Sequence, residues 1–158
     1  MPQNAPHYAA PTPVERVVTR LFGLLVGLGL GLPHNYLLQV RGRRSGRLHA
    51  TPVDVLTHAE TRFVVAGRGD TQWVRNARVS GRIVLKKGFR REALRVRELP
   101  DAEKPPVLKA YLDRFKLTVQ RYFPVRAGSP AADFVTLAPR YPVFELIPSP
   151  GASEQSVK

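Results

Sequence analysis

Apolar residues recur at helical spacing near the start of the chain. They form a single stripe made of Val14, Val17, Val18, Leu21, Leu25 and Leu28. Thr12 and Glu15 have the spacing of a capping box, and Pro13 falls at the first helical position, where proline is well tolerated. The pattern therefore predicts a long N-terminal helix that ends at Gly29 and Gly31.

The segment from Leu21 to Leu32 carries no charged residue, which raises the question of a membrane span. It is too short, because it corresponds to roughly 18 Å of helix where a bilayer core needs about 30 Å. We therefore expect a helix packed on a sheet. Weak peripheral contact with a membrane surface through this helix is the alternative.

From Tyr36 onward the period of the pattern changes from helical to two, which is typical of strands separated by glycine-containing turns. The predicted strands cover residues 36–41, 48–56, 62–66, 82–86, 94–97 and 143–147. Residues 57–60 are read as a turn, and Pro52 indicates a strand edge or a bulge. The 62–66 strand is apolar almost throughout, so we expect it to be buried.

Three further helices are predicted between and after these strands. Asp70 is placed to cap a short helix over residues 71–79 that ends at Gly81. Another helix follows Asp101, with Pro105 and Pro106 in its first turn. A short one runs from Ser129-Pro130 through Leu137.

Together these elements predict a mainly β (α+β) fold. We expect a six-stranded antiparallel barrel with the long N-terminal helix and peripheral helices packed around it. A single domain over residues 12–147 fits the length of 158 residues, with a flexible arm at 1–11 and a disordered tail at 148–158.

Charge is concentrated in the middle of this domain. Residues 41–97 hold 15 Lys and Arg and four acids, so they carry +11 of the formal net charge of +13. Such a surface favours an acidic ligand, a polyanion or a membrane, although an idle basic surface is the alternative. With no Cys and four scattered His, we expect no metal site, no thiolate chemistry and a reducing, cytoplasmic setting.

The turn Gly42-Arg43-Arg44-Ser45-Gly46 is the strongest local signal for ligand binding. Guanidinium groups, a hydroxyl and exposed backbone N–H groups together suit a phosphate. The turn lacks the strand-to-helix setting and the lysine of a nucleotide-binding P-loop. A solvated basic turn is the alternative interpretation.

Trp73 and Asn76 lie three residues apart, so on a helix they share a face that suits a heteroaromatic ring. The alternative is that Trp73 only anchors the core. His49 follows the basic turn on a strand and could contact the same anion or serve as an acid/base group; a plain half-buried histidine is the alternative. No Ser-His-Asp or paired-carboxylate pattern is visible, so no catalytic side chain is predicted.

Several of these segments, taken in order, resemble the deazaflavin-dependent nitroreductase and quinone reductase family. The resemblance rests on residues 36–40, the turn at 42–46, Thr51-Pro52-Val53, residues 63–67 and Trp73-Val74-Arg75-Asn76. It extends from about Leu21 to Ile147. It implies a split β-barrel of the flavin-reductase type and the cofactor F-420, whose phosphate and oligoglutamate tail are acidic and would explain the basic stripe.

The resemblance also implies roles for individual residues. The expected cofactor-binding residues are Arg43, Arg44, Ser45, Gly46, His49, Arg68, Trp73 and Asn76. His49 stands where members of the family tend to carry arginine, and the loop from Gly67 to Gln72 is shorter than in many relatives. The acceptor pocket is expected to involve the N-terminal helix and the segment from Phe134 to Tyr141.

These implications define an oxidoreductase that transfers hydride from reduced F-420 to a quinone-like, nitro or other conjugated, electron-poor acceptor. The alternatives are a non-enzymatic carrier of F-420, haem or lipid, and an oxidoreductase dependent on flavin mononucleotide. Nucleic acid is not expected as a partner, because the central strands supply only Phe63 as an aromatic. The chain is expected to be a monomer or a homodimer.

Overall fold

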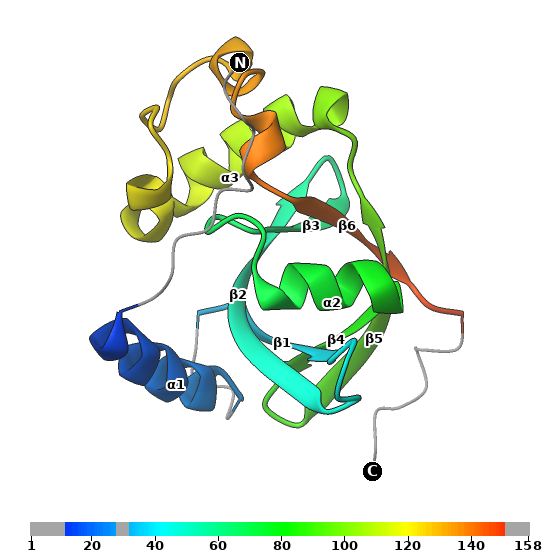
Figure 1. The fold of residues 1–158 in the computed structure, drawn as a ribbon. Helices are drawn as coiled ribbons and strands as arrows, with labels where there is room; N and C mark the ends of the chain where they lie inside the picture. Colours follow the sequence, from blue (N-terminus) through cyan, green and yellow to red (C-terminus); the bar gives the residue numbers. More distant parts are fainter. Residues whose placement is uncertain (1–11, 28–31, 151–158) are drawn as a thin grey trace.

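Six strands form a closed antiparallel barrel in the computed structural model, which describes residues 12–27 and 32–150 (Figure 1). The strands are β1 (Asn35–Arg41), β2 (Leu48–His58), β3 (Thr61–Val65), β4 (Arg82–Lys87), β5 (Arg90–Glu98) and β6 (Val143–Pro148). Their order around the barrel is β1-β2-β3-β6-β5-β4, with β4 pairing back onto β1. The predicted α+β class and six-stranded antiparallel barrel are therefore confirmed.

The turn between β2 and β3 is tighter than the sequence pattern indicates. Thr57 and His58 belong to β2, and only Ala59 and Glu60 form the loop. Both loop residues have positive φ, at 49° and 65°, the backbone of a two-residue hairpin whose twist matches the flanking strands. The predicted strand at 48–56 is for this reason two residues too short.

Alternation along the strands creates two separate hydrophobic cores. Side chains such as Val64 and Phe144 belong to the cluster inside the barrel. Their sequence neighbours Val65 and Val143 belong to a second cluster on the outer face, which packs against the helices. The apolar 62–66 segment is explained by this arrangement, because β3 is buried on both of its faces.

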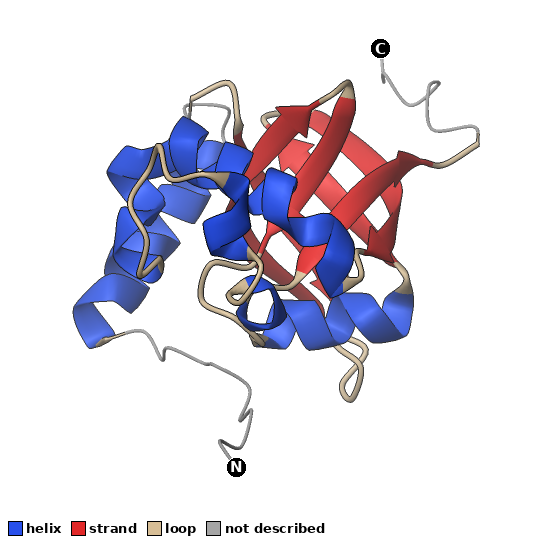
Figure 2. Cartoon of the chain, turned by 90° about the horizontal axis from the view of Figure 1, so that it is seen from above, coloured by secondary structure: helices blue, strands red, loops and turns tan. Residues whose placement is uncertain are grey.

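In the described part of the chain, three α-helices and four short 3-10 turns gather to one side of the strands (Figure 2). The helices are α1 (Pro13–Gly27), α2 (Gln72–Ser80) and α3 (Lys104–Val119). The 3-10 turns are η1 (Asp101–Glu103), η2 (Gln120–Tyr122), η3 (Ala131–Phe134) and η4 (Ala138–Arg140). The short helix expected from Ser129 through Leu137 is observed as the 3-10 turn η3 followed by a non-helical turn at 135–137.

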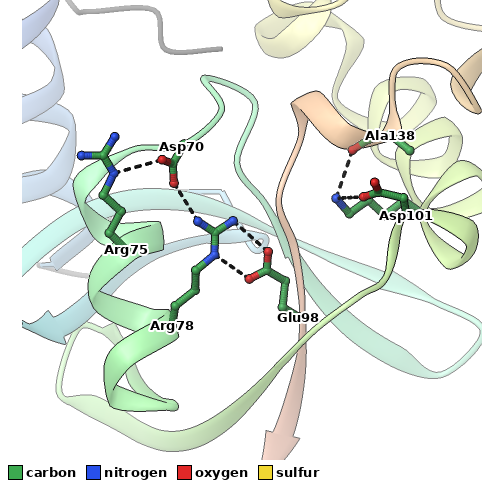
Figure 3. Close-up of polar contacts among 7 residues, drawn as sticks. Asp70, Arg75, Arg78, Glu98, Asp101 and Ala138 are labelled. Atoms are coloured by element: carbon green, nitrogen blue, oxygen red, sulfur yellow. Dashed lines mark hydrogen bonds and ion pairs between the residues drawn. The ribbon is translucent and has the colours of Figure 1, made fainter. Parts of the chain in front are cut away.

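Helix α2 lies across the barrel and ends at Gly81, as predicted, with a left-handed φ of 68°. Asp70 does not cap it; the N-cap is Thr71, whose side chain makes no capping bond. The Asp70 carboxylate accepts instead from Arg75 Nε at 3.0 Å and from Arg78 Nη1 at 2.8 Å, and Arg78 also binds Glu98 (Figure 3). Two arginines one helical turn apart compete successfully for the carboxylate.

Figure 3 also shows how the start of α3 is attached to η4, the turn that precedes β6. Lys104 is buried and donates to Asp101 Oδ1 at 2.7 Å and to the carbonyl of Ala138 at 3.0 Å. Pro105 and Pro106 fall in the first turn of α3, as predicted.

Helix α1 begins as predicted, but its apolar stripe is not buried against the sheet. The Thr12 N–H donates to Glu15 Oε2 at 2.7 Å and the Glu15 N–H donates to Thr12 Oγ1 at 3.2 Å, which confirms the capping box. Val17, Val18 and Leu21 are 58%, 58% and 59% exposed, so the expectation of a packed stripe is wrong for the side chains up to Leu21. The predicted helix end at Gly29 and Gly31 lies outside the described residues, as does the arm at 1–11. Within the described chain, none of the helices is both long and apolar enough to cross a membrane.

Candidate functional site

A cavity of about 1120 Å³ lies where α1, β2, α2 and the end of α3 meet. Its walls come from α1, the turn at 42–45, β2 residues 49–54, the segment 65–68, the start of α2, and residues Tyr111 and 118–122 except Gln120. It is large enough to hold a cofactor-sized ligand. Residues from Pro13 to Tyr122, at the two ends of the lining in sequence, therefore contribute to one site.

One wall of the cavity is the first half of β2, which pairs with only one neighbouring strand. β2 pairs with β1 along Leu48–Asp54 but with β3 only from Val55 onward. Pro52 falls in the half without a second neighbour, which confirms that it marks an edge, since proline cannot donate to a ladder there. The edge leaves room beside β2 for a ligand.

The basic turn stands at one end of this wall. Gly42, Arg43, Arg44 and Ser45 line the cavity, whereas Gly46 does not. The Gly46 N–H donates to the Gly42 carbonyl at 3.0 Å, and its φ of 68° makes it the hinge of the turn. Gly46, which we predicted to contact the cofactor, is therefore placed as a turn-forming residue.

A glycine is needed at the start of the turn because neighbouring side chains approach its backbone closely. A Cβ at Gly42 would lie 2.8 Å from Ser45 Oγ and 2.9 Å from His49 Nε2. The His49 imidazole thus sits directly beside the turn, as the sequence indicated. A side chain at position 42 would therefore displace either the Ser45 hydroxyl or the His49 imidazole.

Asn76 joins the turn to α2. It is buried, and its amide oxygen accepts from the Arg43 backbone N–H at 3.1 Å and from Arg43 Nη1 at 2.9 Å. Gln72, which the sequence did not single out, accepts from the same Nη1 at 3.0 Å. The Asn76 oxygen expected to face a ligand is therefore occupied in fixing Arg43, and Arg44 is left as the exposed guanidinium of the turn.

Trp73 and Arg68 also line the cavity. Trp73 is half-buried and lies 5.7 Å from the Phe144 ring, centroid to centroid, so it serves the barrel core and the cavity together. The Arg68 guanidinium lies over the Tyr122 ring at 5.4 Å. Both residues line the cavity, and each was predicted from the sequence to do so.

Positive charge predominates along the lining. The arginines are Arg16, Arg20, Arg43, Arg44, Arg68, Arg75 and Arg121. Only four of these come from the basic stretch at 41–97, so most of that stretch covers other parts of the barrel. Glu15 at the start of α1 lies 4.0 Å from Arg68 and 3.6 Å from Arg121, and its hydrogen bond from the Thr12 N–H, aided by these arginines, lowers its pKa. A cavity of this charge suits an acidic ligand.

The far wall differs from the one expected. No residue of the segment from Phe134 to Tyr141 lines the cavity, because Phe134, Leu137 and Tyr141 are buried in the outer core. Tyr111, Val119 and Tyr122 take that place from α3 and η2. Helix α1 contributes to the lining through residues such as Arg16 and Val17.

A closed barrel with an open half-strand beside a basic, tryptophan-containing cavity defines a small-molecule-binding β-barrel protein. Residues 14–124 match the F420H(2)-dependent quinone reductase family, and the chain belongs to it. No curated protein matches the sequence. The resemblance drawn from the sequence is thereby confirmed at the level of the family.

Solved structures support the fold. A protein of unknown function from Agrobacterium tumefaciens strain C58 is 18% identical, with a TM-score of 0.55 over 91% of this chain and 59% of that one. This chain therefore spans less than two thirds of that protein. The heme storage protein HutZ of Vibrio cholerae is 15% identical, with a TM-score of 0.51 over 89% of this chain and 93% of its own. A chain described as a domain-swapped dimer is 16% identical, with a TM-score of 0.51, over 85% and 99% of the two chains.

Proposed function

We propose that the protein is an oxidoreductase that transfers hydride from reduced F-420 to a quinone-like, nitro or other conjugated, electron-poor acceptor. The observation that carries this proposal is the cavity itself. The basic turn, which suits a phosphate, and Trp73 both line this one continuous cavity. Membership of the family supports the cofactor. The acceptor class rests on the resemblance together with the mixed apolar and basic lining.

The residues present fit an acidic, ring-containing cofactor. Arg44 and Ser45 are exposed on the turn, and the space kept free by Gly42 allows an anion to approach them. Arg43 is held rigidly by Asn76 and Gln72, which reduces the entropy lost on binding. We assign the phosphate to this turn, the acidic tail to the remaining arginines, and the ring to the side lined by Trp73.

When bound, the reduced deazaflavin supplies a hydride. The task of the chain is then to bind cofactor and acceptor face to face and to exclude water, which contributes rate through orientation. Trp73 is supported from behind by Phe144, so its ring offers a fixed apolar surface for placement. His49 stands beside the turn and is assigned to the anion rather than to the hydride step.

A lipophilic acceptor would enter this cavity from the side bordered by α1. The exposed apolar stripe of α1 lies on a helix whose Arg16, Val17 and Arg20 also line the cavity. Apolar side chains next to exposed arginines are the combination that attaches a helix to an anionic bilayer surface. We therefore propose weak peripheral contact of α1 with anionic lipid, with the protein otherwise in the cytoplasm as a monomer or homodimer.

The test is a titration of the purified protein with F-420, flavin mononucleotide and haem, followed by stopped-flow oxidation of F-420H2 against a panel of quinones and nitro compounds. We expect F-420 to bind tightest and at least one quinone to be turned over. Trp73→Ala is expected to slow the reaction more than His49→Ala does. Binding of F-420 without turnover of any acceptor would favour a carrier, preferential binding of flavin mononucleotide would favour a flavin enzyme, and failure to bind F-420 would overturn the proposal.

A further inference from the structure

Asp54 is the one carboxylate among the described residues that line the cavity, where every other charged side chain is an arginine. It lies on the open half of β2, directly opposite Asn35 of β1. Its side chain is 18% exposed. Among the described residues, no arginine forms an ion pair with it; its titratable neighbour is His34, whose Nε2 lies 3.6 Å from Oδ1. A carboxylate in a basic cavity that is not neutralised by an arginine calls for a chemical explanation.

The carboxyl group is held in place by fixed neighbours. Asn35 is buried, donates from Nδ2 to Asp54 Oδ1 at 2.5 Å, and accepts from the Leu32 N–H at 3.0 Å. His34 is backed by the Phe115 ring, centroid to centroid at 4.7 Å. Both contacts of Asp54 involve Oδ1, and Oδ2 makes no hydrogen bond with the described residues. One oxygen is thus anchored while the group as a whole faces the cavity.

The surroundings of Asp54 favour its neutral form. Burial raises the pKa of Asp54, and the opposing effects of His34 and Asn35 are smaller. Tyr111 from α3 lines the same cavity, and burial first and the charge of Asp54 second raise its pKa, so this hydroxyl stays protonated. The arginines that line the cavity are on α1 (Arg16 and Arg20), the basic turn (Arg43 and Arg44), the 65–68 segment (Arg68), α2 (Arg75) and η2 (Arg121).

We propose that Asp54 is the proton donor to the acceptor. This inference rests on the proposed function. A quinone-like acceptor that takes up a hydride gains two electrons and one negative charge, which one proton neutralises. The O–H bond of the Asp54 carboxyl breaks, a new O–H bond forms on the acceptor oxygen, and the Asp54 carboxylate is reprotonated from solvent.

The assignment predicts a distinctive pH dependence. The active form of Asp54 is protonated, so the rate of acceptor reduction is highest at low pH and falls as the pH rises through the raised pKa of Asp54. Asp54→Asn should retain the contact with Asn35 through its amide oxygen but cannot donate a carboxylic proton. General acid catalysis contributes roughly 10²- to 10⁴-fold, so we expect at least about a tenfold loss of rate at low pH and a flat profile.

The experiment measures single-turnover oxidation of F-420H2 by a water-soluble quinone from pH 5 to pH 9, with buffers chosen for about constant ionic strength. The variants are Asp54→Asn, Asp54→Glu, and Asp113→Asn as a control. Asp113 is on α3, is paired with Lys109 at 2.7 Å and does not line the cavity, so its variant should keep the wild-type profile. Asp54→Glu restores a carboxyl group and should recover part of the pH-dependent rate. The F-420 dissociation constant should change by less than about twofold in both Asp54 variants, since the basic turn supplies the anion contacts.

A readout without cofactor or acceptor accompanies the kinetics. In protein labelled with ¹³C at the aspartate carboxyl carbons, the resonance missing from Asp54→Asn should titrate above the ordinary range of aspartate. A resonance that titrates within or below that range would overturn the assignment, as would an unchanged pH profile in Asp54→Asn when the wild type is active. Lack of turnover by the wild type with every acceptor would overturn the proposed function and this inference together.

Discussion

Asn76 holds Arg43 at two points: its amide oxygen accepts from the Arg43 backbone N–H at 3.1 Å and from Arg43 Nη1 at 2.9 Å. The two residues are 33 positions apart, on α2 and on the turn between β1 and β2. One buried amide thereby fixes the path of the basic turn and the direction of one of its two guanidinium groups. The conformation of the basic turn therefore depends on a contact within the protein, between Asn76 and Arg43, rather than on a contact with a ligand.

Replacement of Asn76 by Leu should loosen this arrangement. The Arg43 N–H loses its acceptor in a part-buried place, which costs about 1–3 kcal/mol in the free energy of unfolding. Urea denaturation measures that loss, and a titration with F-420 should show weaker binding. Gln72→Leu removes only an exposed partner of Arg43 and should change stability by about 0.5 kcal/mol or less. Equal effects of the two variants would contradict the central role of Asn76.

The guanidinium groups of the turn should dominate cofactor affinity. Arg43→Ala combined with Arg44→Ala removes two charged hydrogen-bond donors, each worth roughly 1.5–3 kcal/mol, so F-420 should bind at least about tenfold more weakly with the fold intact. Arg47→Ala is the matched control, because Arg47 directly follows the turn and is exposed but does not line the cavity. If the double variant has the circular dichroism spectrum of the wild type and an unchanged dissociation constant for F-420, the turn is not part of the binding site.

The two glycines of the turn should behave differently when replaced by alanine. Gly42→Ala brings a Cβ to 2.8 Å from Ser45 Oγ and 2.9 Å from His49 Nε2, so F-420 binding should weaken. Gly46→Ala meets no atom within 4 Å but forces alanine to a φ of 68°, so stability should fall by about 1 kcal/mol with affinity little changed. Calorimetric binding and thermal unfolding of both variants test the contrast. A Gly46→Ala variant that loses affinity and keeps its stability would show that this assignment of roles is reversed.

The α1 stripe should associate weakly with anionic lipid. In flotation with vesicles of phosphatidylglycerol, we expect a minor bound fraction that is released at about 0.5 M salt, where charge attraction is screened within roughly 4 Å. Val17→Glu with Leu21→Glu should abolish it. Val79→Glu is the control, because Val79 is 70% exposed on α2 and does not line the cavity. Binding that persists through alkaline carbonate extraction would instead demonstrate an integral segment.

The barrel was predictable from sequence because alternation and glycine placement are local signals. Strand pairs such as β4 and β5 are joined by a short turn at Gly88, so neighbours in sequence became neighbours in space. Predictions from the sequence were wrong where one residue could make two different contacts. Asp70 has the position of a helix cap, but two arginines on α2 bind it more strongly.

The cavity was predictable only in part. The turn at 42–45, His49, Arg68 and Trp73 carry chemistry that can be read directly, and all of them line it. Tyr111, Tyr122 and Asp54 have no such local signal, because their placement depends on how α3 returns to the open half of β2. A helical apolar stripe also fits a buried or an exposed helix face equally well, so the pattern of α1 could not decide between them.

Helix α2 faces the barrel core with Val74 and Ala77 and the cavity with Trp73 and Asn76. A ligand that stabilises the cavity side of α2 therefore also stabilises the packing of α2 on the barrel core. The free energy of ligand binding and the free energy of locally unfolding α2 are linked for this reason. Saturation of the cavity should slow amide exchange at Val74 and Ala77, which are shielded from any bound molecule. The hydrophobic centre of this protein can accordingly report on whether its binding site is filled.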